Sequence, residues 1–518
     1  MKRLDPRTAV LGAILAALVA HVGRFLALPY GEKLSFVPDD AFYYFQLGRE
    51  HARNGVWSFD GGQTRTSGFH LLHAWFATLL ERVGGSDGLR LSLYVVVGAI
   101  ATAAALVVCD RVASRLFPGG RVAALLFAAA AGGTFILPLQ AMEWPLAVLA
   151  FALAAYGLAT ERPALFAGAM LVGPACRSDF VLVAGSLFLA ALLRPREIDA
   201  RLRRRLALGF GGSALGALAV ALHTYAISGS FLQTSARTKA FWGTVSGYQP
   251  LYGLEPSSYA FGPSLLLTRT FDFGPALLLV PIGGLGLAAL WLRRELAAEP
   301  PLARLVTRWS GLVIVLLPLA YGRIGTAALC WYSAFFVVPF FVVSAALANA
   351  LLRRRPSWQT ALLVAGVLTA AVNAFDARRP IWPAGTLGDD LRKMAVDPTV
   401  TRSASWNAGR IGYLGGQRTI NIDGLVNDDV YPYLVADRAH CYLVHERVPL
   451  VVDQLLWLDQ HPRMLGASNG RLRAAMRRRV IEGTNLEAYD VDLPSLAADP
   501  ACAEDLRSAR ARAARPYP

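Results

Sequence analysis

Long apolar segments recur through this 518-residue chain and limit its fold more than any other feature. A helix needs roughly 20 consecutive apolar residues to cross a hydrocarbon core of about 30 Å. Segments near that length lie at 8–28, 91–109, 121–139, 143–160, 206–227, 274–292, 306–321, 327–350 and 361–375. Only 17% of the residues are charged, which excludes a large soluble enzyme. We therefore expect a polytopic α-helical membrane protein.

One further apolar stretch, residues 164–193, is interrupted by Arg177, Ser178 and Asp179. Each half has about 13 residues, which is short for a separate crossing. If the two halves cross separately and turn at these residues, every cluster of basic residues falls on one side. Lys and Arg tend to remain cytoplasmic, so this topology is favoured over a single crossing. It predicts about eleven crossings, with the N-terminus in the cytoplasm and the C-terminus outside.

This topology divides the chain into a transmembrane domain, residues 1–375, and an extracytoplasmic part, residues 376–518. The transmembrane domain has two large external loops, at residues 29–90 and 228–273. The net charge of +15 comes mainly from arginines in short runs between the apolar segments, so it does not indicate nucleic acid as a partner.

The C-terminal part is long enough to bury a core of its own. Strand-like or apolar runs lie at 418–423 and 440–444, and a helical pattern lies at 449–459. Together they predict a small α/β domain. Four glycines around Arg410 predict a flexible loop. Cys441 and Cys502 lie in the same domain, and whether they form a disulfide is left open by the sequence.

Two adjacent carboxylates, Asp39 and Asp40, begin a predicted helix in the first external loop. The aromatic residues that follow them suit an amphipathic helix in the headgroup layer. An Asp at this place can cap a helix. Two like charges side by side also raise one pKa, which suits a general base or a metal ligand. Spacing alone leaves these alternatives open.

Other ionisable residues lie close to the predicted membrane boundary. Arg237 and Lys239, beside hydroxyls and aromatic residues, suit an anionic lipid headgroup, although such residues also anchor proteins at the interface. Glu143 begins a predicted span, and Arg177 and Asp179 lie at the turn. Charges at such depth cost about 2.5 to 3.5 kcal/mol each, so we expect them to be paired or to line a polar cavity.

Several motifs occur together with the Asp pair. They are Asn54-Gly55, Phe59-Asp60-Gly61, Ser67-Gly68-Phe69-His70, Met142-Glu143, Arg177-Ser178-Asp179, Ser235 to Lys239, and Trp406 to Asp429. With the Asp pair, this set resembles the bacterial membrane glycosyltransferases of the GT-C superfamily. Relatives include the aminoarabinose transferase of lipid A, protein O-mannosyltransferases and mycobacterial arabinofuranosyltransferases. Two positions depart from the pattern, since Ser178 replaces a usual proline and Leu71 follows His70 where many relatives have proline.

The resemblance implies an enzyme of the bacterial inner membrane that uses a polyprenyl-phosphate-linked sugar donor and a glycan, lipid or protein acceptor. No nucleotide pool exists outside the membrane, which agrees with a lipid-linked donor. The implied roles are Asp40 or Asp39 as general base and Lys239, Arg237 or Arg177 on the donor phosphate. Substrate binding is implied for Glu143, Asp179, His70 and Tyr43.

No cofactor is required by this chemistry, although Asp39 and Asp40 also suit a divalent cation such as Mg²⁺ or Mn²⁺. The alternative is a transporter or flippase of lipid-linked sugars. Such proteins often contain inverted repeats with interrupted helices in both halves, whereas this sequence shows one clear interruption. The sequence predicts no oligomeric state.

Overall fold

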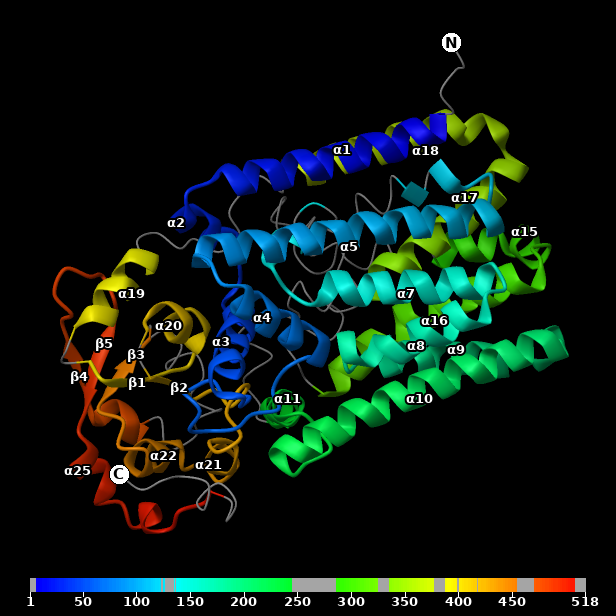
Figure 1. Cartoon of the computed structure of the whole chain (residues 1–518). Coiled ribbons are helices and arrows are strands. Elements are labelled where there is room, and N and C mark those ends of the chain that lie inside the picture. Colours follow the sequence, from blue (N-terminus) through cyan, green and yellow to red (C-terminus); the bar gives the residue numbers. More distant parts are fainter. Residues whose placement is uncertain are drawn as a thin grey trace.

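The computed structural model describes residues 6–122, 124–125, 135, 137–244, 286–324, 335–376, 387–397, 400–416, 418–453 and 470–507. Four helices in these ranges are long and apolar enough to cross a membrane, namely α1 (Pro6–Ala27), α5 (Asp87–Leu116), α10 (Ala200–Ser228) and α17 (Val337–Arg354). The same half of the molecule contains α7 (Trp144–Ala159), α8 (Pro163–Cys176), α9 (Phe180–Leu192), α15 (Arg293–Ala297), α16 (Pro301–Ile324) and α18 (Gln359–Asp376) (Figure 1). This architecture agrees with the predicted multi-pass membrane protein.

The predicted interruption at 177–179 is confirmed, because α8 and α9 are separate short helices with a turn between them. The predicted spans at 121–139 and 274–292 lie largely outside the described residues. The number of about eleven crossings therefore stays a prediction.

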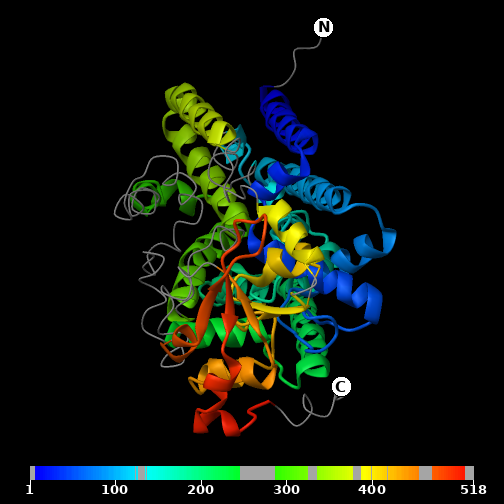
Figure 2. The same cartoon turned by 90° about the vertical axis from the view of Figure 1, so that its left-hand side faces the viewer.

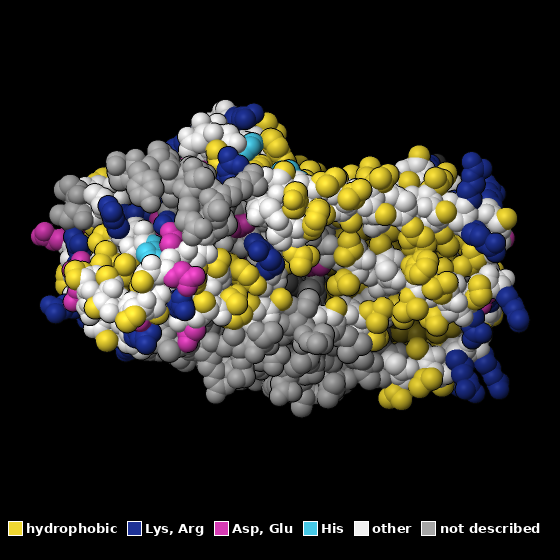
Figure 3. Space-filling model, turned by 90° about the horizontal axis from the view of Figure 1, so that it is seen from below, with side chains coloured by type: hydrophobic (Ala, Val, Ile, Leu, Met, Phe, Trp, Pro, Cys, Tyr) yellow, Lys and Arg dark blue, Asp and Glu magenta, His cyan; other side chains and the backbone are white. Residues whose placement is uncertain are grey.

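Arginine-rich segments gather at one end of the helical half, which is the right-hand end in Figure 3. Segments 111–121, 194–205 and 353–355 lie where α5 ends, where α10 begins and where α17 ends. Between this end and the C-terminal part, the surface is a broad apolar band (Figure 3). Charge segregation of this kind is what the positive-inside tendency predicts, although the side on which each terminus lies stays a prediction.

The first loop predicted to be external, residues 29–90, folds into α2 (Tyr30–Lys33), a short 3₁₀ turn at Leu34–Phe36, α3 (Asp39–Asn54) and α4 (Leu71–Val83). The helix predicted to begin at Asp39 is confirmed, but its predicted place on a lipid headgroup layer is wrong. Helix α3 packs against α4 and against α20 (Ala408–Leu414) of the C-terminal part, and its aromatic residues are buried in protein. The approach to α4 is so close that a Cβ atom on Gly48 would lie 2.6 Å from the Cβ atom of Ala77.

The C-terminal part contains a small mixed sheet with short helices (Figures 1 and 2). The strand order is β2-β1-β3-β5-β4, with β1 parallel to β2 and β3, and with β5 antiparallel to β3 and β4. The strands are β1 (Arg402–Ser405), β2 (Arg418–Asn421), β3 (Leu450–Val452), β4 (Met476–Arg479) and β5 (Ala488–Val491). The helices are α19 (Leu387–Val396), α20 (Ala408–Leu414), α21 (Tyr431–Val435), α22 (Ala439–His445) and α25 (Leu493–Ala497).

Three local predictions in this part are wrong. The glycine-rich segment around Arg410 is helix α20, the run at 440–444 is helix α22, and the segment predicted as a helix from 449 begins with strand β3. Short apolar runs fit helix and strand periodicities about equally well, so contacts with the rest of the fold determine which structure such a run adopts. Strand β2 agrees with the run predicted at 418–423.

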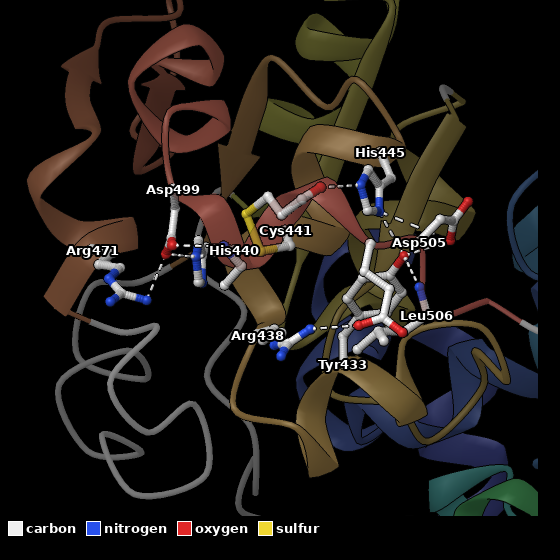
Figure 4. Close-up of a disulfide and its surroundings, with 12 residues drawn as sticks. Tyr433, Arg438, His440, Cys441, His445, Arg471, Asp499, Asp505 and Leu506 are labelled. Carbon is white, nitrogen blue, oxygen red and sulfur yellow. Dashed lines mark hydrogen bonds and ion pairs between the residues drawn. A yellow bond between two sulfur atoms is a disulfide. The ribbon is translucent and has the colours of Figure 1, made fainter.

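The question left open about the cysteines is answered by a disulfide between Cys441 in α22 and Cys502 (Figure 4). It joins positions 61 residues apart. Beside it, Asp499 accepts a hydrogen bond from His440 at 2.9 Å and pairs with Arg471 at 2.6 Å. A cross-link over a loop of this length typically stabilises a fold by about 2 to 4 kcal/mol, so it fastens the end of the described chain to the sheet domain.

Candidate active site

A cavity of about 170 Å³ lies where the two loops predicted to be external meet the C-terminal part. Its walls come from α3, the segment before α4, the α8–α9 turn, helix α11 (Thr234–Thr244) and residues 425–426. These elements lie at the end of the helical half that is remote from the arginine-rich segments (Figure 1). Seven of the nine predicted site residues line this cavity, namely Asp40, Tyr43, His70, Glu143, Arg177, Asp179 and Lys239.

Asp40 lies at the cavity wall, at the start of α3. Its pKa is raised to about 7, mainly by loss of solvent; the charge of Lys239 opposes this shift, and the nearby carboxylates Asp39 and Glu143 add to it. A carboxyl group whose pKa lies near neutrality is half ionised at pH 7 and can accept a proton, which suits a general base.

Asp39 does not line the cavity. Its Oδ2 accepts a hydrogen bond from the backbone N–H of Gly409 at 2.9 Å, and its Oδ1 accepts one from Arg410 at 2.8 Å. The guanidinium of Arg410 in turn donates to the carbonyls of Leu34 and Val37. Asp39 is thus a helix cap, but it caps α20 and not its own helix, and it fastens the first loop to the C-terminal part. Burial raises its pKa to about 6.

Glu143, Arg177 and Asp179 form one ion-pair cluster. Both carboxylate oxygens of Asp179 accept hydrogen bonds from Arg177, at 2.7 and 3.1 Å, and another Arg177 nitrogen donates to Glu143 Oε1. The side chains of Glu143 and Arg177 are each 2% exposed. The sequence had left an ion pair and a place in a polar cavity as alternatives for Arg177 and Asp179, and the structure has both.

His70 lies against this cluster. Its Nδ1 accepts a hydrogen bond from the backbone N–H of Ser178 at 3.4 Å, and its Nε2 lies 3.7 Å from Glu143 Oε1. Burial lowers the pKa of His70 to about 4, so the ring is neutral at pH 7. With Nδ1 as the acceptor, the ring proton resides on Nε2 and faces the carboxylate.

The two basic residues of α11 point to different places. Lys239 lines the cavity. Arg237 instead lies 3.7 Å from Asp428, donates to the hydroxyl of Thr234 at 3.2 Å and stacks over the ring of Tyr431 at 4.9 Å. Arg237 therefore joins α11 to the C-terminal part and is not among the cavity-lining residues.

The sequence did not assign a role to Asp423, which the structure brings beside the predicted site. Its Oδ2 accepts a hydrogen bond from the hydroxyl of Tyr43 at 3.1 Å, and its Oδ1 accepts one from the N–H of Leu425 at 2.6 Å. Burial raises the pKa of Asp423 to about 8. Asp423 lies in the stretch from Asn421 to Leu425, which resembles GT-C proteins, so the sequence did draw attention to this region. Nothing in that stretch indicated that Asp423 lies beside Tyr43.

Ser178 and Gln233 are further cavity residues that the sequence did not single out. The hydroxyl of Ser178 donates to the Gln233 side chain at 2.9 Å, and Gln233 donates to the carbonyl of Phe69 at 2.6 Å. These bonds tie the α8–α9 turn, α11 and the first loop together, so three chain segments hold one another in place at the cavity.

The geometry does not favour a divalent cation shared by Asp39 and Asp40, because both oxygens of Asp39 face backbone N–H groups of α20. Within the described ranges, one group of His, Cys and acidic side chains is compact enough to offer three metal ligands, namely His440, Cys441 and Cys502. Its two sulfur atoms form the disulfide.

No family model matches the chain, and no curated protein matches its sequence. A solved structure is similar, the crystal structure of ArnT from Cupriavidus metallidurans bound to undecaprenyl phosphate. It has a TM-score of 0.55 and 12% identity, and the match covers 93% of this chain and 98% of that chain. The chain has a GT-C fold.

The crystal structure of the same ArnT in the apo state has a TM-score of 0.54 and 12% identity, with 95% of this chain and 99% of that chain covered. The likeness thus extends through the membrane half and the C-terminal part. The fold implied by the short motifs is confirmed, whereas the roles of single residues stay predictions.

Proposed function

We propose that this protein is an integral-membrane glycosyltransferase. It moves a sugar from a polyprenyl-phosphate carrier to a glycan, lipid or protein acceptor at the extracytoplasmic face of a bacterial cell membrane. The observation that carries the proposal is that one cavity, remote from the arginine-rich end, holds both Asp40 and Lys239. Undecaprenyl phosphate, which is bound in the similar ArnT structure, supports this class of carrier.

In the proposed reaction, the Asp40 carboxylate removes the proton from an acceptor hydroxyl while the hydroxyl oxygen attacks the anomeric carbon of the donor sugar. The bond between that carbon and the phosphate oxygen breaks, and the carrier phosphate leaves. Lys239 neutralises the charge that develops on the leaving phosphate. These steps use no metal ion or other cofactor.

Among the three cations implied by the resemblance, Lys239 suits the phosphate best. Arg177 already contacts two carboxylates, and Arg237 lies against Asp428, so both guanidinium groups contribute to architecture. Because Lys239 and Asp40 line the same cavity, one pocket supplies both the base and the phosphate ligand. A flippase that carries lipid-linked sugars needs no base, so a transfer assay separates the two functions.

Lys239→Met should lower the rate of sugar transfer by about 100- to 1,000-fold, because a preorganised cation at the leaving group is lost. Purified protein is incubated with radiolabelled undecaprenyl-phosphate sugars and a membrane extract as the acceptor, and label in the product is counted. Arg237→Met is the matched control and should retain transfer to within about tenfold, because its partner Asp428 lies outside the cavity lining. Equal losses in the two variants, or no transfer of any sugar by the wild-type protein, would contradict the proposal.

The pH dependence offers a separate test. The base works in its ionised form, so the transfer rate should rise with pH through about 7, the pKa of Asp40. Lys239 lowers that pKa, so removing its charge raises it and should move the acidic limb of the Lys239→Met profile to higher pH. Profiles of kcat/KM against pH, which report the free enzyme, check this for both proteins, and a limb that stays in place or moves to lower pH would count against Asp40 as the base.

A further inference from the structure

Glu143 has one carboxylate oxygen that receives no hydrogen bond from the part of the chain that the structure describes. Its Oε1 accepts a hydrogen bond from Arg177, but its Oε2 is buried and has no hydrogen-bond partner among the described residues. Burying a charged oxygen without a donor is unfavourable, so such an atom requires an explanation. Because Glu143 is a cavity-lining residue, a ligand in the cavity can supply the missing donor.

The polar side chains around Glu143 are already engaged. Both oxygens of Asp179 accept from Arg177, and the hydroxyl of Ser178 donates to Gln233. Among the cavity-lining residues, Glu143 alone has a buried side-chain oxygen or nitrogen without a partner in the described part of the chain. Among the described residues of the α8–α9 turn and the segment before α7 that line the cavity, Glu143 Oε2 is therefore the buried side-chain atom that still lacks a hydrogen bond.

The chemistry of the missing donor follows from the charge of the cluster. Arg177 already supplies a cation to Glu143, so what Oε2 lacks is a hydrogen-bond donor and not a neutralising charge. A sugar hydroxyl meets this need, because it is a neutral donor of the right size. The carboxylate is held by Arg177 and cannot turn away to find another donor, so it favours a ligand that carries a hydroxyl at one position.

We propose that Glu143 Oε2 accepts a hydrogen bond from one hydroxyl of the transferred sugar and thereby selects the donor. This inference rests on the proposed glycosyltransferase function. The transferred sugar fits this place better than the acceptor does, because Glu143 is 1% exposed and its ligand must enter the cavity fully. The hydroxyl that Asp40 deprotonates belongs to the acceptor, and Asp40 lines the same cavity from the start of α3.

The expected selectivity is large enough to measure. A donor that lacks the recognised hydroxyl leaves Oε2 unpaired in the complex, so its kcat/KM should fall by about 10- to 100-fold. Removal of a hydroxyl at any other ring position should have a smaller effect, because it leaves no buried charge without a partner.

The test combines substrate and protein changes. Undecaprenyl-phosphate mannose, glucose and arabinose are screened with the wild-type protein, and monodeoxy analogues of an active donor are then assayed with the wild type and with Glu143→Gln. For one analogue, the loss caused by the missing hydroxyl should be present in the wild type and absent or much reduced in Glu143→Gln. Losses that multiply independently for every analogue would overturn the inference.

Asp179→Asn is the matched control, because this residue belongs to the same cluster but has both oxygens bound by Arg177. It should lower kcat/KM by the same factor for every donor analogue. If Glu143→Gln does not fold, the wild-type protein and Glu143→Asp are compared instead. A wild-type kcat/KM that falls less than about threefold with every analogue also overturns the inference. A wild-type protein that transfers none of the carrier-linked sugars refutes the proposed function itself, whereas transfer without this selectivity refutes only the role of Glu143.

Discussion

Asp40→Asn should lower the rate constant of sugar transfer by about 100- to 10,000-fold, the range that a positioned general base contributes. The amide has nearly the same shape as the carboxyl but cannot accept the proton of the acceptor hydroxyl. Lys239 remains in the cavity, so binding of the carrier phosphate should be retained. Transfer of radiolabel gives kcat, and quenching of tryptophan fluorescence by undecaprenyl phosphate gives the affinity. Unchanged transfer by Asp40→Asn would eliminate the mechanism.

Asp39→Asn is the control for this experiment, because the two residues are neighbours with different contacts. An amide at position 39 presents an NH₂ group to one of the backbone N–H groups of Gly409 and Arg410. The melting temperature should therefore fall, since one buried donor loses its acceptor. The rate per folded molecule should fall far less than in Asp40→Asn. The reverse ranking of the two variants would assign the base to Asp39.

The helical framework could be predicted from sequence because a bilayer permits few alternatives. Apolar length marked α1, α5, α10 and α17, and the distribution of basic residues required a turn at 177–179, where the structure separates α8 from α9. The C-terminal part was harder. Its helices α20 and α22 have seven residues each, and the N-terminus of α20 is capped by Asp39 from 370 residues earlier in the chain. Periodicity in a short window carries no information about such a partner.

The site could be predicted to the extent that topology alone brings residues together. All turns on one side of a helical bundle meet at one end, so Asp40, Glu143, Arg177 and Lys239 share a cavity although they are far apart in sequence. Which of two neighbouring side chains faces that cavity depends on contacts with the C-terminal part. The backbone N–H groups of Gly409 and Arg410 donate hydrogen bonds to Asp39. Asp428 and the ring of Tyr431 contact Arg237. Residue type and spacing do not encode these pairings.

The same reasoning explains why Asp423 was missed. In the sequence, a carboxylate in the C-terminal part has no visible connection to a helix of the first loop. In the structure its partner is Tyr43, 380 positions away. The C-terminal part also contributes Leu425 and Val426 to the cavity wall, so the site is composite. Any account of acceptor choice must therefore include residues from both halves of the chain.

Arg177→Met should lower the free energy of unfolding by roughly 3 to 5 kcal/mol, because it leaves the buried carboxylate of Glu143 without its cation. Arg177 and Glu143 are each 2% exposed, so Glu143 has no water as a ready substitute, whereas Asp179 is 17% exposed. Arg201→Met is the matched control. Its side chain is 77% exposed, and its pair with Glu161 should be worth no more than about 1 kcal/mol. Thermal unfolding in detergent, followed by tryptophan fluorescence, compares the two variants.

The charge argument also predicts a rescue. A triple variant that adds Glu143→Gln and Asp179→Asn to Arg177→Met removes the unpaired charges and should be more stable than Arg177→Met alone. Replacing a whole buried ion-pair cluster with neutral groups avoids the desolvation cost that breaking it exposes. If Glu143 binds the sugar, the triple variant should regain stability without regaining the wild-type rate of sugar transfer. If Arg177→Met unfolds no earlier than Arg201→Met, the cluster is not what holds the α8–α9 turn against the cavity.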